Sequence, residues 1–150
     1  MGNRPTPGTP SKPQRRLLAI DPGSRRTGLA LSDELGMLAH PRPALLMGAG
    51  PAVEAIARLI EAEDVSEIIV GLPVTMAGGA SQQTTEARAF AAAIRARVTV
   101  PVREWDERLS SVEAGRRLQG RRERASGERD SAAAAILLQA VLDARRSTEA

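Results

Sequence analysis

Cysteine is absent from this sequence, and aromatic residues are nearly so, with one Phe, one Trp and no Tyr among 150 residues. The lack of cysteine excludes disulfides, cysteine-ligated zinc and thiol catalysis. No apolar run approaches the roughly 20 residues that span a bilayer, and the N-terminus is polar and proline-rich rather than signal-like. Export and membrane insertion are therefore not expected, and a reducing cytoplasm is the natural compartment.

The chain does have enough aliphatic material for one core. Hydrophobic residues make up 42% of the sequence, and Ala, Leu, Ile and Val must build the interior because aromatics are so few. A length of 150 residues suits one domain. Residues 1–14 contain four prolines and almost no apolar side chains, which is typical of a disordered tail. We therefore predict a disordered tail over 1–14 and a single domain over 15–150.

The periodicity of apolar residues predicts the order of strands and helices. Short apolar runs predict five strands, at 16–21, 27–32, about 37–41 (with 45–47 as an extension), 67–72 and 98–105. Helical spacing predicts helices at 51–63, 84–97 and 130–146, and a capping-box pattern predicts another from Ser110. This order indicates an α/β fold. We expect a mixed five-stranded sheet, a three-strand antiparallel meander followed by a βαβα unit, with helices on both faces.

Acidic residues stand where predicted strands end. Asp21 follows the first strand, the pair Asp106 and Glu107 follows the fifth, and Asp130 opens the last predicted helix. In α/β sheets ligands gather at the carboxyl ends of the strands, and carboxylates brought together there need a cation to offset their repulsion. Oxygen ligands without His or Cys favour Mg²⁺ or Mn²⁺ over zinc. Such an ion would activate a water and stabilise the leaving oxygen of a phosphodiester.

Each of these acids also has an ordinary structural explanation. Asp21 before Pro-Gly suits a turn, and Asp130 suits the first turn of a helix, where a carboxylate favours the helix dipole. Glu107 beside Arg108 could form a surface ion pair of little consequence. The metal site is therefore predicted from the coincidence of several acids, since no single one requires it.

Arginine is concentrated in one segment, 116–129, which holds six arginines against two glutamates. Such a segment suggests a polyanionic partner, because its arginines can bind phosphates. Charge runs are also common on solvated surfaces. The arginines that we take as nucleic-acid-binding candidates here are Arg121, Arg122 and Arg124. A non-catalytic nucleic-acid-binding module, acting in transcription or ribosome assembly through this segment, is the alternative to an enzyme.

Four segments together resemble the YqgF/RuvX family. They are 19–28 (AIDPGSRRTG), 69–73 (IVGLP), 105–109 (WDERL) and 130–134 (DSAAA), in the family's order, and the resemblance spans roughly 16–145. The combination of D-x-G-x-[KR]-R-x-G with G-L-P and W-D-E-R is specific, whereas each motif alone would be weak.

The resemblance implies an RNase H-like fold related to the Holliday-junction resolvase RuvC. It implies a hydrolase, an endonuclease that resolves Holliday junctions in DNA recombination and repair, or that matures the 5′ end of pre-16S rRNA in ribosome biogenesis. The implied partner is nucleic acid, as branched DNA or precursor rRNA or both. Because a junction resolvase normally acts through two sites related by a twofold axis, a homodimer is expected at least when junction is bound.

Matched by position, Asp21, Glu107 and Asp130 correspond to the family's catalytic acids and would hold Mg²⁺ or Mn²⁺. Asp106 belongs to the same motif as Glu107. Because neighbouring residues on a strand alternate faces, only one of these two should face the ion, and we favour Glu107. Three further residues are candidates for phosphate contact: Arg25, Arg26 and Arg108.

The chain departs from many relatives in the loop after Gly-Leu-Pro. Where those relatives carry Asn and Asp, this sequence has Thr75 and Ala77. If that loop orients the substrate, the specificity of this chain should differ from theirs.

Overall fold

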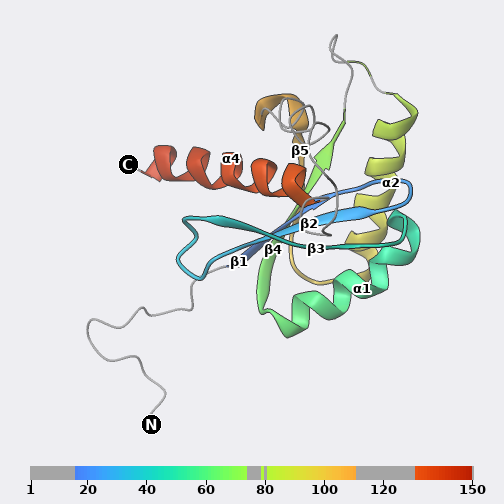
Figure 1. Ribbon diagram of the computed structural model, residues 1–150, viewed down its shortest axis with the longest axis horizontal. Coiled ribbons are helices and arrows are strands. Elements are labelled where there is room, and N and C mark those ends of the chain that lie inside the picture. The colour runs from blue at the N-terminus through green and yellow to red at the C-terminus, as the bar shows by residue number, and fades with distance from the viewer. Residues whose placement is uncertain (1–15, 74–78, 80, 111–130, 150) are drawn as a thin grey trace.

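The computed structural model describes residues 16–73, 79, 81–110 and 131–149 (Figure 1). Five strands form one sheet in the order β3-β2-β1-β4-β5. The elements in chain order are β1 (Arg16–Asp21), β2 (Thr27–Ser32), β3 (Ala39–Leu45), α1 (Ala49–Ala62), β4 (Val65–Leu72), α2 (Gln82–Arg97), β5 (Val102–Asp106), the 3-10 helix η1 (Glu107–Ser110) and α4 (Ala132–Glu149).

Strand direction follows from the length of each connection. The short turns after β1 and β2 join antiparallel neighbours, because a tight turn reverses the chain. Helices α1 and α2 carry the chain back across the sheet, so β1, β4 and β5 run parallel. The predicted meander followed by strand–helix alternation is confirmed.

Two cores lie on opposite faces of the sheet. Leu18 and Ile20 of β1 pack with residues of α1 and α2 on one face, whereas Leu17 and Ala19 pack with α4 on the other. Figure 1 shows α4 on one side of the sheet and the pair α1 and α2 on the other. A central strand with two covered faces reads as a continuous apolar run, which is why β1 was evident from sequence.

Three strands differ from their predicted bounds, and β4 does so only by beginning at Val65 rather than at Glu67. The third strand of the chain runs from Ala39 to Leu45, although it contains Pro41 and Pro43. It lies at the edge of the sheet, where a missing N–H is tolerated. The fifth strand starts at Val102 and not at Val98, because the Val98 N–H donates to Ile94 O (3.0 Å) and ends α2.

Several predicted segments lie outside the described residues. These are the tail over 1–14, the helix expected after Ser110 and the arginine-rich segment 116–129. In the part of the chain that the structure describes, no helix combines the length and apolar character needed to cross a membrane.

Glu67 on β4 joins three elements on the α4 face. Its side chain is 11% exposed, and it accepts from Nη2 of Arg145 on α4 at 2.7 Å and from Nε of Arg103 on β5 at 2.6 Å. The hydrogen bond from Arg145, helped by that from Arg103, lowers the pKa of Glu67 against the opposing effect of burial. This ion pair fixes α4 to the sheet.

We expect Glu67→Gln to lower the free energy of unfolding by about 1–2 kcal/mol at pH 7 and by less in acid. The folded-state pKa lies below the usual glutamate value. The stabilisation is therefore complete above the unfolded pKa of about 4.3 and is lost as the pH falls through the folded pKa. Urea unfolding of both proteins between about pH 7 and pH 3 should show the difference closing.

The exposed pair between Glu54 and Arg97 provides a matched control. Glu54→Gln should leave the unfolding free energy unchanged within error, because exposed ion pairs are screened by water. A Glu67→Gln difference that stays constant into acid would contradict the charge-dependent origin of the stabilisation.

Candidate active site

The carboxyl ends of the three parallel strands β1, β4 and β5 lie side by side at the same end of the sheet. Ile20 of β1 pairs with Val70 of β4, and Gly71 of β4 pairs with Trp105 of β5. Neighbouring strands are about 4.8 Å apart. Asp21 ends β1 and is therefore next to Gly71 on β4. β5 is the neighbour of β4 on its other side.

Glu107 lies directly over Gly71. A Cβ built on Gly71 would stand 3.0 Å from Oε2 of Glu107 and 3.2 Å from Cδ2 of Leu137 on α4. Glu107 is only 7% exposed. Because side chains alternate along a strand and Ala19 packs against α4, Asp21 belongs to this same face of the sheet. Glu107 thus lies over Gly71 and Asp21 lies on the strand beside it, and the missing side chain of that glycine makes room for Glu107.

Asp106 has different surroundings from Glu107. Trp105 packs toward α4, so the next residue of the strand turns to the opposite face. The Asp106 carboxylate accepts from Nη2 of Arg108 at 2.6 Å and from the Arg108 backbone N–H at 2.9 Å. The guanidinium of Arg108 first, and then its backbone N–H, hold the pKa of Asp106 below its usual range. Glu107, not Asp106, lies on the same face as Asp21.

The start of α4 is anchored beside Asp21. Ser131 is fully buried, and its Oγ accepts from the Leu29 N–H of β2 at 3.0 Å. Leu29 follows Gly28, which pairs with Asp21 across β1 and β2. Asp130, the third predicted ligand, precedes Ser131 in the sequence and lies outside the described residues, as do Arg121, Arg122 and Arg124.

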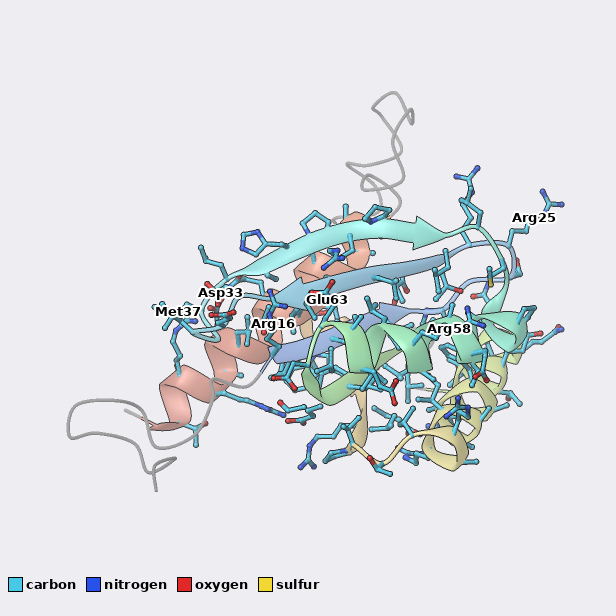
Figure 2. The ribbon with its side chains drawn as sticks, turned by 90° about the horizontal axis from the view of Figure 1, so that it is seen from below. Arg16, Arg25, Asp33, Met37, Arg58 and Glu63 are labelled. Carbon is cyan, nitrogen blue, oxygen red and sulfur yellow. The ribbon has the colours of Figure 1, made fainter. Side chains whose placement is uncertain are left out.

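Two predicted phosphate contacts lie in the β1–β2 turn, beyond Asp21. Arg25 and Arg26 are exposed, and Figure 2 shows Arg25 directed into solvent. The turn itself is closely packed, since a Cβ on Gly23 would stand 2.3 Å from the Arg26 carbonyl oxygen. The third, Arg108, pairs with Asp106 as described, so a phosphate there would compete with a carboxylate.

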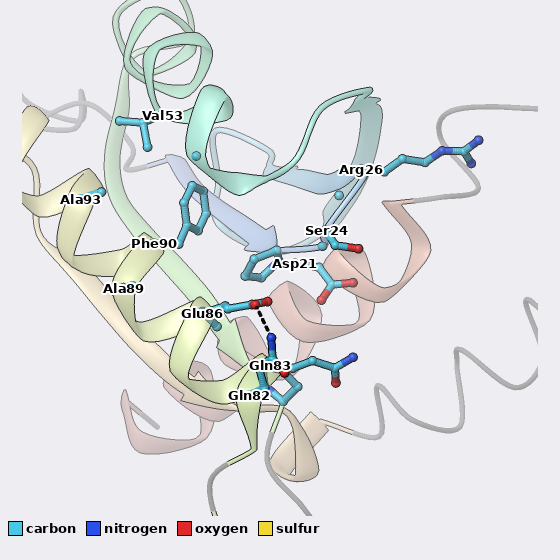
Figure 3. Close-up of a pocket in the computed structure, with 16 residues that line it drawn as sticks. Asp21, Ser24, Arg26, Val53, Gln82, Gln83, Glu86, Ala89, Phe90 and Ala93 are labelled. Carbon is cyan, nitrogen blue, oxygen red and sulfur yellow. Dashed lines mark hydrogen bonds between the residues drawn. The ribbon is translucent and has the colours of Figure 1, made fainter.

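A cavity of about 990 Å³ opens beside Asp21, between the β1–β2 turn, α1 and α2 (Figure 3). Phe90, Gln82 and Glu86 of α2 contribute to its lining. No sequence motif pointed to it. The available signal was the alanine-rich sequence of α2, which places Ala89 and Ala93 at the cavity.

The donor chemistry at this edge fits a hard divalent cation. Asp21 and Glu107 offer carboxylate oxygens only, the ligands that Mg²⁺ and Mn²⁺ prefer. The space over Gly71 holds one of these carboxylates against the sheet. Within 16–73, 79, 81–110 and 131–149, no group of three or more His, Asp or Glu side chains is placed to hold a metal. Two of the three predicted ligands fall within those ranges.

The chain is similar to known proteins over most of its length. A family model described as RuvX, Holliday junction resolvase, matches residues 15–144. A relative from Koribacter versatilis is 41% identical over 140 residues, covering 91% of this chain and 92% of its own. One from Thermobifida fusca is 41% identical over 143 residues, covering 88% and 89%. Both carry the name "Putative pre-16S rRNA nuclease".

A solved structure with a similar fold is that of Thermus thermophilus RuvC in complex with a Holliday junction substrate. It matches with a TM-score of 0.59 at 15% identity, over 89% of this chain and 97% of that one. The predicted RNase H-like fold is confirmed by this match. Because the family model spans residues 15–144 and the named relatives are similar over nearly their full length, the chain belongs to the RuvX family.

Proposed function

We propose that this chain is a metal-dependent endonuclease that hydrolyses phosphodiester bonds in structured nucleic acid. The observation that carries the proposal is that Glu107 lies over Gly71 while Asp21 ends the neighbouring strand, on the same face of the sheet at the carboxyl ends of its parallel strands. The description of the family model and the names of the relatives support a nuclease.

In this proposal Asp21, Glu107 and Asp130 hold Mg²⁺ or Mn²⁺. When bound, such an ion lowers the pKa of a water and stabilises the charge on the leaving oxygen. The contribution of the chain is to fix its carboxylates in advance. Glu107 is buried and packs over Gly71, so little conformational freedom remains to be lost when it binds a ligand. Arg25 and Arg26 stand beyond Asp21, where they can neutralise the phosphates that flank the cut.

Two substrates follow from the names of similar proteins. The family model describes a Holliday junction resolvase, and the relatives are named for pre-16S rRNA. A four-way junction is cut symmetrically only if two active sites act together, so that activity requires two copies of the chain on the DNA. Maturation of one rRNA end needs a single site.

An endonuclease assay with and without Mn²⁺ tests the proposal. The full chain should cut either a four-way DNA junction or precursor 16S rRNA in preference to duplex DNA. Chelation with EDTA should abolish cutting, and Mn²⁺ in excess of the chelator should restore it. Cutting unaffected by chelation would overturn the metal site. Salt-sensitive binding of all three substrates without any cutting would instead favour a non-catalytic nucleic-acid-binding module.

A further inference from the structure

The cavity beside Asp21 is kept open by small residues. Ala89 and Ala93 are exposed on α2 where it borders the cavity. On α1, a Cβ added to Gly50 would meet no atom within 4 Å. The side chains at these positions are too short to fill the space between the two helices and the β1–β2 turn. The volume of about 990 Å³ is large enough for a ligand of nucleotide size.

The polar lining of the cavity accepts hydrogen bonds and is acidic. Glu86 supplies a carboxylate, Gln82 and Gln83 supply amides, and Asp21 borders the cavity. Nε2 of Gln82 donates to Oε2 of Glu86 over 3.2 Å (Figure 3), which leaves Oε1 of Glu86 to accept from a ligand. Arg26 is at the rim, and Figure 3 shows its guanidinium directed away from the cavity. The carboxylate of Glu86 disfavours a phosphate inside the cavity and favours a neutral group with N–H donors.

The apolar lining includes Phe90, the single phenylalanine of the chain. Phe90 is only 4% exposed and backs an apolar wall to which Val53 and Ala89 also contribute, next to the polar edge formed by Glu86 and Gln82. A nucleobase has this same division, since its faces pack on apolar groups and its edge carries donors and acceptors. We propose that the cavity binds one unstacked nucleobase, carrying an exocyclic amine that donates to Glu86.

This inference rests on the proposed function, because the base would belong to the strand that is cut. Asp21 borders the cavity, so a phosphate bound by a cation at Asp21 would bring a neighbouring base within reach of the cavity. A base inside an intact duplex cannot enter, and the substrate must therefore be unpaired or distorted next to the cut. Adenine, guanine and cytosine have the required amine, whereas uracil presents a carbonyl in its place.

Binding can be tested without any cleavage. In the full chain labelled at alanine methyl groups, we expect cytidine 5′-monophosphate to shift the NMR signals of Ala89 and Ala93. The signal of Ala92, which is exposed on α2 but does not line the cavity, should stay in place. Uridine 5′-monophosphate should bind about tenfold more weakly, and Glu86→Ala should remove that preference. Equal binding of both nucleotides would overturn the assigned role of Glu86.

Variants that fill the cavity test whether a base of a bound nucleic-acid strand enters it. Gly50→Leu and Ala89→Leu should each weaken binding of a single-stranded oligoribonucleotide about tenfold. They should have no effect on an oligonucleotide that is abasic at the bound position, and Ala92→Leu is the matched control. Leucine is a better helix former than glycine, so Gly50→Leu should not unfold α1.

The experiments can contradict the nuclease activity and the base-binding cavity independently of each other. If Mn²⁺-dependent cutting occurs but neither nucleotide shifts Ala89 and Ala93 and Gly50→Leu binds and cuts like wild type, the base site is wrong and the nuclease stands. If the shifts and the effect of Gly50→Leu on binding are found without any cutting, the base site stands and the nuclease is wrong. If only the free nucleotide binds and the oligonucleotide does not depend on Gly50, the cavity does not receive a base of the strand and the inference is overturned.

Discussion

Replacing Asp21 by Asn is expected to lower the rate of cleavage on the order of a thousandfold. Asparagine keeps the shape of the side chain but removes the negative charge that a divalent ion requires. Affinity for nucleic acid should change by less than about threefold, because phosphate contacts come from arginines and not from this carboxylate. Single-turnover cleavage of the preferred substrate in Mn²⁺, together with a binding titration in Ca²⁺, separates the two quantities.

Asp143→Asn is a matched control for this substitution. Asp143 is exposed on α4 and pairs with Arg146 on the same helix. It lies about 18 Å along the helix axis from Ser131, so it is remote from the edge that carries Asp21. The control should cut at the wild-type rate. Undiminished cutting by the Asp21→Asn protein would show that this carboxylate does not belong to the site.

Gly71→Val is expected to lower cleavage about a hundredfold through the position of Glu107. A Cβ alone would stand 3.0 Å from Oε2 of Glu107 and 3.2 Å from Cδ2 of Leu137, and the methyl groups of valine would come closer. Since Leu137 is buried in the core, Glu107 is the side chain that must move. Gly71→Ala should fall between wild type and Gly71→Val. The measurement is the rate of cleavage at saturating Mn²⁺ for the three proteins.

Overpacking also costs stability, about 1–3 kcal/mol, and this effect must be separated from the loss of activity. Val141→Ala is a suitable control, because Val141 is fully buried on α4 and its truncation should cost about 2 kcal/mol. At a temperature where circular dichroism shows all variants folded, Val141→Ala should cut normally. Equal losses of cleavage in Val141→Ala and Gly71→Val would contradict a specific role for the space over Gly71.

The strands with unambiguous apolar runs were predictable from sequence. The bounds of β1 and β2 agree with the prediction, because each strand is covered on both faces and a Pro-Gly turn separates them. The third strand was not predictable in its full extent, since Pro41 and Pro43 argue locally against a strand. Its pairing with β2 along the sheet edge is a tertiary effect that local pattern does not contain.

For the candidate site, the sequence predicted which acids stand at strand ends. It did not predict what surrounds each of them. The alternation argument predicted that Asp106 and Glu107 would face different ways. Asp106 pairs with Arg108 and Glu107 lies over Gly71, but Glu107 belongs to η1 and not to β5, so strand alternation is not the reason. The role of Gly71 required the fold, because Glu107 and Leu137 reach it from two other elements. The cavity beside α2 also depends on three segments that are distant in sequence, and no local pattern encodes it.

The two prolines of β3 determine how this sheet can be extended. Pro41 pairs with Ala30 of β2, and the register with β2 shifts between Arg42 and Leu45, where Pro43 lies. Neither proline has an N–H to offer to an added strand. The strand β3 therefore cannot supply a regular ladder of donors to an added strand. If a second copy of the chain assembled on a four-way junction, it would find no regular ladder of donors along β3 on which to continue the sheet.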